Sequence, residues 1–122
     1  ANSGVVPAGG TVSPQQIRSL ALGAGFTPDQ ARIMEAIAMA ESSGNSVAHN
    51  KVPPDNSYGL WQINMIGALG PERRAQLGLS RNEQLFDPAT NARAAKVIFD
   101  SQGLGAWSVY KSGAYRQFLR NP

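Results

Sequence analysis

The spacing of apolar residues along the chain predicts a mostly helical protein. A first helix is expected from Ser13, which is suited to an N-cap position, to Gly23, which is suited to ending a helix. A second helix is expected after Thr27 and Gln30, which have the spacing of a capping box, and it should end near Gly44.

The middle of the chain has a different pattern. Residues 52–57 (VPPDNS) are typical of turns, and residues 58–64 (YGLWQIN) are rich in β-prone side chains. This combination predicts a small β hairpin or an irregular sheet. A brief helix is expected over residues 71–77, stopped by Gly78.

The last third of the chain returns to helical spacing. Ser80 and Glu83 have the spacing of another capping box, and a strong helix is expected from about residue 88 to residue 102. Residues 105–119 predict two short helices. The expected fold class is therefore mostly α, with one small β hairpin.

Composition indicates one domain and excludes several chemistries. The 122 residues suffice for one core, and the Gly-rich residues 1–12 predict a flexible tail or linker before a domain over residues 13–122. Because the chain begins with Ala, we expect a processed protein or part of a larger one. With no cysteine and one histidine, we expect no disulfide, no metal site and no cofactor.

The net charge of +3 favours an anionic partner, either nucleic acid or a cell-wall polymer. The basic residues are scattered and form no stripe interleaved with aromatic residues, which argues against nucleic acid. The longest apolar run is far shorter than the roughly 20 residues of a membrane span, so no membrane insertion is expected.

Glu41 interrupts the apolar face of the second predicted helix. Met34, Ile37 and Ala38 define that face, and Glu41 follows where another apolar residue is expected. Burial and the negative end of the helix dipole would both raise the pKa of this carboxyl, as a general acid requires. The alternative is that the helix frays near Gly44 and leaves Glu41 in solvent.

The segment after this helix carries amides beside aromatic residues. On a β-strand, Gln62 and Asn64 would share one face, next to the rings of Tyr58 and Trp61. Amides bind sugar hydroxyl and N-acetyl groups, and rings cover the apolar faces of sugars, so the pattern suggests glycan binding. The alternative is a core strand with Trp61 and Ile63 inward and both amides in solvent.

The chain resembles the lysozyme-like superfamily, which includes c-type and goose-type lysozymes and bacterial and phage lytic transglycosylases. The resemblance rests on Glu41-Ser42 at a helix end and on the YG-φ-φ-QI-N pattern of residues 58–64. It continues through Asn91-Ala92 and Gly105-Ala106-Trp107, and covers roughly residues 27–118.

The resemblance implies cleavage of the β-1,4 MurNAc–GlcNAc bond of peptidoglycan, with Glu41 as the catalytic acid. A lysozyme is itself the standard example of a carboxyl whose pKa an apolar pocket raises, so this part comes from the family. The implied substrate-binding residues are Ser42, Ser57, Tyr58, Gln62, Asn64, Trp107 and Tyr110. For Ser42 the alternative role is capping the helix end.

One position departs from the c-type lysozymes. Their second carboxylate directly precedes the Tyr-Gly pair, where this chain has Ser57, and the nearest acid is Asp55. Asp55 is therefore a candidate second catalytic residue only if the turn is irregular. Hydrolysis and single-acid lytic transglycosylation, which gives a 1,6-anhydro product, both stay open.

A non-catalytic glycan-binding or structural module of a phage tail or secretion apparatus is the alternative function. It would gain nothing from an acid at Glu41. His49, the one histidine, has no Gly-x-Ser-x-Gly elbow to support a serine hydrolase. We expect the protein to act on the bacterial cell wall, in the periplasm, outside the cell or from a virion.

Overall fold

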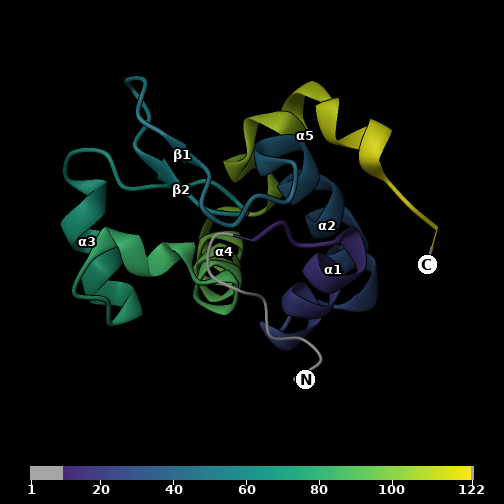
Figure 1. Cartoon of the computed structure of the whole chain (residues 1–122), viewed down its shortest axis with the longest axis horizontal. Helices are drawn as coiled ribbons and strands as arrows, with labels where there is room; N and C mark the ends of the chain where they lie inside the picture. The colour runs from purple at the N-terminus through teal and green to yellow at the C-terminus, as the bar shows by residue number, and fades with distance from the viewer. Residues whose placement is uncertain (1–9, 122) are drawn as a thin grey trace.

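A computed structural model of the chain describes residues 10–121 and confirms the mostly α fold class. The helices are α1 (Pro14–Gly23), α2 (Pro28–Ser42), α3 (Leu69–Leu77), α4 (Pro88–Gln102) and α5 (Ser108–Ser112), with 3-10 turns η1 (Asn82–Phe86), η2 (Leu104–Ala106) and η3 (Ala114–Phe118). In Figure 1, α4 lies between α3 on one side and α1 with α2 on the other.

The β element lies beside α3 (Figure 1) and contains three short strands, one more than the predicted hairpin. They are β1 (His49–Asn50), β2 (Ser57–Tyr58) and β3 (Ile63–Asn64), paired antiparallel in the order β1-β2-β3. Ser57 pairs with both Asn50 and Asn64, so these three residues form one row across the sheet.

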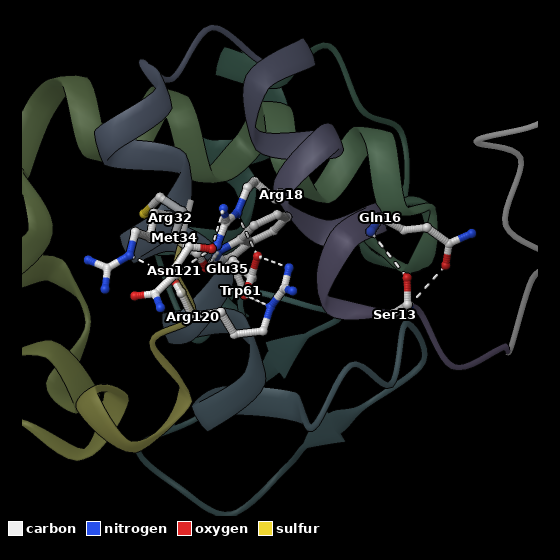
Figure 2. Close-up of polar contacts among 9 residues, drawn as sticks. All are labelled: Ser13, Gln16, Arg18, Arg32, Met34, Glu35, Trp61, Arg120 and Asn121. Atoms are coloured by element: carbon white, nitrogen blue, oxygen red, sulfur yellow. Dashed lines mark hydrogen bonds and ion pairs between the residues drawn. The ribbon is translucent and has the colours of Figure 1, made fainter.

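The predicted Thr27–Gln30 capping box forms, and Ser13, which was predicted as an N-cap, forms a second capping box with Gln16. The Ser13 hydroxyl accepts from the Gln16 N–H, and the Gln16 side chain accepts from the Ser13 N–H (Figure 2). Thr27 and Gln30 make the same pair at the start of α2. These contacts satisfy backbone donors that a helix end leaves free, and they fix where α1 and α2 begin.

Other predicted boundaries differ from the structure. The Ser80–Glu83 capping box is wrong, because Gln84 rather than Glu83 accepts from the backbone N–H of Ser80. The helix before it begins two residues earlier than predicted, at Leu69. The end of the chain forms one α-helix and two 3-10 turns in place of two short helices.

Residues 10–12 do not belong to a tail, although the sequence predicted one through residue 12. Val12 is 1% exposed, and its N–H donates to Gly44 O at 2.8 Å. Gly10 O accepts from the Ser46 hydroxyl at 2.9 Å. This short stretch therefore covers the loop that follows α2, while residues 1–9 of the predicted tail lie outside the described part of the chain.

Helix α2 runs through the centre of the core. All five residues from Met34 to Ala38 are buried, so the helix contacts neighbours on several faces and not on one stripe. Trp61 is fully buried against it and donates its indole N–H to Met34 O at 2.9 Å (Figure 2). Apolar burial around α2 thus supplies the main driving force for folding.

Glu35 is the carboxylate that this central helix buries completely. Its two oxygens accept from Arg18 Nε at 2.7 Å and from Arg120 Nε at 2.7 Å (Figure 2). Arg32 also donates to the backbone carbonyl of Arg120. Because two guanidinium groups neutralise the buried charge, this cluster ties the C-terminal segment to α1 and α2.

Candidate active site

A cleft of about 460 Å³ lies between the sheet with α3 on one side and the end of α4 with α5 on the other. Glu41, in the last turn of α2, faces into it. The residues that line it are mostly polar: Glu41, Asn50, Asp55, Ser57, Gln62, Ile63, Asn64, Leu69, Arg73, Ile98, Gln102, Ala106, Trp107 and Ser108. Five of the predicted site residues besides Glu41 are among them.

Glu41 is partly buried, and no residue of the described part of the chain neutralises its carboxyl. Among residues 10–121, no hydrogen bond or ion pair to its carboxyl is found, in contrast to Glu35 six residues earlier on the same helix. Two effects together raise its pKa from 4.5 to about 7. Burial is the larger one, and the negative charge of Asp55 is the smaller one. A carboxyl with this pKa carries a proton for much of the time near neutral pH.

Asp55 reaches the cleft from the loop between β1 and β2. Its carboxylate accepts long hydrogen bonds from one side chain of each strand: Asn50 at 3.4 Å, Ser57 at 3.4 Å and Asn64 at 3.5 Å. The row of residues across the sheet therefore holds Asp55 in place with neutral donors. A second carboxylate thus shares the cleft with Glu41, although it does not directly precede the Tyr-Gly pair.

Gln62 and Asn64 both line the cleft, but not as alternating residues of one strand. Gln62 lies in a turn with φ of 48°, and β3 begins only at Ile63. The Gln62 amide N–H groups donate to Ala48 O and Gly59 O, while no partner for its amide oxygen is found within the described residues. That oxygen can accept a hydrogen bond from a ligand.

Asn64 is occupied within the protein. Its amide oxygen accepts from the backbone N–H groups of Asn56 and Ile66, and its amide nitrogen donates to Pro54 O and Asp55. These contacts join Asn64 to the loop that carries Asp55.

The turn before Gln62 depends on a contact between Gly59 and Asn91. The Asn91 side chain is buried, donates to Tyr58 O and Leu85 O, and accepts from the Trp61 N–H. Gly59 has φ of 77°, and a Cβ there would collide with the Asn91 amide. Only glycine fits this close approach, which explains the Tyr-Gly pair in physical terms.

Trp107 lines the cleft at the start of α5. It is 5% exposed, and its indole N–H donates to Trp61 O at 2.9 Å. Trp61 in turn donates to Met34 O in α2, so two tryptophans connect the helix of Glu41 to the start of α5. The Trp107 ring contributes apolar surface to a lining that is otherwise mostly polar.

Three predicted substrate-binding residues do not line the cleft. The Ser42 hydroxyl is buried and donates to Ala38 O at 2.9 Å, which matches its alternative role at the helix end. Tyr58 is 4% exposed and stacks on His49 with ring centroids 4.1 Å apart. Tyr110 stacks on Tyr115. All three are engaged within the protein, and nothing in the sequence indicated the stacking partners of Tyr58 and Tyr110.

Asn50 and Arg73 are among the lining residues that were not predicted from the sequence as site residues. Asn50 lies in β1, whose pairing with β2 brings it beside Asp55. Arg73 lies on α3 and donates to Asn64 O at 2.6 Å. The adjacent pair Arg73-Arg74 was visible in the sequence, but nothing local showed that α3 folds against the sheet.

A larger hollow of about 820 Å³ lies elsewhere, between α1 and the start of α4. It contains no carboxylate, and its one charged lining residue is Arg93, which donates to Leu77 O. The smaller cleft carries Glu41 and is therefore the candidate active site. Across residues 10–121, no group of three potential metal ligands is found. No helix in this range has both the length and the apolarity to cross a bilayer.

Comparison with known protein families identifies the chain. The model of the family described as lysozyme-like domain matches residues 18–109, which is well over half of the chain. The chain belongs to the lysozyme-like domain family. The matched part of this lysozyme-like domain includes Glu41, Asp55, Gln62, Asn64 and Trp107. No curated protein and no solved structure matches it. Membership indicates a peptidoglycan-related glycosidase or transglycosylase activity directed at the cell wall.

Proposed function

We propose that this lysozyme-like domain cleaves the β-1,4 MurNAc–GlcNAc bond of peptidoglycan strands, with Glu41 as general acid. The observation that supports this most is the unpaired Glu41 carboxyl, partly buried in a polar cleft, with its pKa raised to about 7. A binding module has no use for a carboxyl held in this state, whereas proton transfer requires it.

In the proposed first step, Glu41 donates its proton to the glycosidic oxygen as the bond from that oxygen to C1 breaks. Positive charge develops on the sugar ring, and the Asp55 carboxylate stabilises it electrostatically. The amide oxygen of Gln62 accepts from a sugar hydroxyl or N-acetyl N–H, and Trp107 supplies an apolar surface for a ring face. Ser57 and Asn64 keep Asp55 oriented.

In the second step, Glu41 is a carboxylate and acts as a base. It removes a proton either from water, whose oxygen then bonds to C1, or from the muramyl 6-hydroxyl, whose oxygen closes a 1,6-anhydro ring. The first route is hydrolysis and the second is lytic transglycosylation. Mass spectrometry of the released muropeptides separates them, since the anhydro product is lighter by one water.

The test of catalysis compares the parent with Glu41→Gln, which keeps the side-chain shape and removes the proton. We expect release of soluble fragments from purified peptidoglycan to fall by at least about 100-fold. Glu83→Gln is the matched control, because Glu83 is exposed and lies outside the cleft, and it should keep the parental rate. If Glu41→Gln releases fragments at the parental rate, a non-catalytic module becomes the better assignment.

A further inference from the structure

Arg73 is the one cationic side chain among the described residues that line the cleft. It is partly buried on α3, and it contributes one hydrogen bond to the protein, from Nη1 to the backbone carbonyl of Asn64 at 2.6 Å. A guanidinium has five N–H donors in a fixed planar arrangement. Most of the binding capacity of this group is therefore unused within the described part of the chain.

No carboxylate in residues 10–121 forms an ion pair with Arg73. By contrast, Arg18 and Arg120 both pair with the buried Glu35. Burial lowers the pKa of Arg73, and the charge of Glu72 acts in the opposite direction. A guanidinium stays charged at neutral pH despite such a shift, so the cleft contains a partly dehydrated cation with no counterion among residues 10–121.

The location of Arg73 limits which anion it can meet. Its contact with Asn64 places it on the side of the cleft where the sheet holds Asp55, opposite Trp107 and Ser108. The Asp55 carboxylate repels an anion that lies close to it, so an anionic group is favoured on an arm that projects from the bound strand toward Arg73 on α3.

We propose that Arg73 binds a carboxylate on the lactyl arm of a muramyl residue and so selects muramyl-containing strands. This inference rests on the proposed function, because it takes the peptidoglycan strand as the ligand. In peptide-free strands the carboxylate is that of the lactyl group itself; in peptide-bearing strands it belongs to the stem peptide attached there. Either one fits the forked geometry of a guanidinium, and a strand of N-acetylglucosamine alone offers neither.

The test measures binding in a Glu41→Gln background, where the ligand should not be consumed. Three hexameric probes are titrated calorimetrically: an N-acetylglucosamine hexamer, a peptide-free muramyl glycan and a peptide-bearing muramyl glycan. Each is compared with and without Arg73→Gln. Arg116→Gln is the control, because Arg116 is exposed and outside the cleft and the change in net charge is the same.

We expect Arg73→Gln to weaken binding of the acidic glycans by about ten- to a hundredfold, the range of a lost charge-assisted hydrogen bond. Binding of the N-acetylglucosamine hexamer should change less than about twofold and serves as the check that the variant folds. Arg73→Lys should recover part of the loss, because it restores the charge without the fork. Loss with the peptide-free glycan identifies the lactyl carboxylate, and loss confined to the peptide-bearing glycan identifies the stem peptide.

Equal weakening for all three probes, no weakening for any, or no binding of the acidic glycans would overturn the inference. Cleavage by the parent protein is measured separately on purified peptidoglycan. Cleavage without charge-selective binding means that Arg73 alone is misassigned. Charge-selective binding without cleavage leaves the role of Arg73 standing and removes the proposed catalysis.

Discussion

Replacing Glu41 with glutamine should stabilise the fold at alkaline pH, while it removes the proposed acid. The folded protein holds this carboxyl with a pKa of about 7, and in the unfolded chain the pKa returns to about 4.5. Below pH 4.5 both states are protonated, and the raised pKa costs no stability. As the pH rises from 4.5 to 7, the unfolded state loses its proton first, and stability falls. Above pH 7 the whole penalty is present.

The size of the effect follows from the same pKa values. The gap between 4.5 and about 7 corresponds to at most about 3.5 kcal/mol of free energy of unfolding. Because Glu41 is only partly buried, solvent screening reduces this, and we expect a gain of about 1–2 kcal/mol. For a domain of this length, such a gain raises the Tm by about 3–8 °C.

The assay is thermal unfolding of the parent and Glu41→Gln, followed by circular dichroism at pH 4 and pH 8. The difference in stability between the two proteins should be larger at pH 8 than at pH 4 by about 1–2 kcal/mol. Glu83→Gln, at an exposed position outside the cleft, should show no such pH dependence. If the stability difference between the parent and Glu41→Gln is the same at both pH values, burial does not raise the pKa of Glu41.

Three other substitutions test different parts of the structure. Asp55→Asn should shift the alkaline limb of the pH profile of kcat/KM to lower pH, by less than half of the gap between 4.5 and about 7, because burial is the larger cause. Glu35→Gln should cost about 3 kcal/mol in urea unfolding, since it leaves two guanidinium groups without their buried partner. Gly59→Ala should cost roughly 3 kcal/mol or more in the same assay, through collision with Asn91.

The two substitutions that test stability, Glu35→Gln and Gly59→Ala, each have a control on the same chain. Asp100→Asn removes the exposed Lys96 ion pair and should cost less than about 1 kcal/mol. Gly67→Ala also has positive φ, but nothing lies within 4 Å of its Cβ position, so only backbone strain of about 1 kcal/mol is expected. An alkaline limb that is unchanged or moves upward in Asp55→Asn would contradict a repulsive effect of Asp55. If Glu35→Gln and Asp100→Asn lower the free energy of unfolding equally, burial of the Glu35 ion pairs is not the cause. If Gly59→Ala and Gly67→Ala lower it equally, collision with Asn91 is not the cause.

Helix boundaries set by local contacts could be predicted from the sequence. Ser13 with Gln16 and Thr27 with Gln30 join residues three positions apart, so the spacing alone specifies them. At Ser80 the predicted partner was wrong by one residue. The backbone N–H groups of Ser80 and Arg81 both donate to the side-chain oxygen of Gln84 and not to Glu83. The segment that follows is the 3-10 turn η1, and the spacing of polar residues in the sequence does not distinguish such a turn from the start of an α-helix.

Long-range contacts could not be predicted in this way. Glu35 lay beside the expected apolar stripe, and only the arrival of Arg120 from the far end of the chain explains how it can be buried. Arg73 enters the cleft because α3 folds back onto β3. Gln62 was expected in a strand, but the buried Asn91 side chain holds the preceding residues in a turn. Each case depends on partners distant in sequence.

The most direct measurement is an NMR titration of the Glu41 side-chain carboxyl carbon in ¹³C-labelled protein, with Glu41→Gln used to assign the signal. The raised pKa predicts a midpoint near pH 7. A midpoint near 4.5, the ordinary value for a glutamate, would mean that the carboxyl is fully hydrated and that Glu41 is not a proton donor at neutral pH.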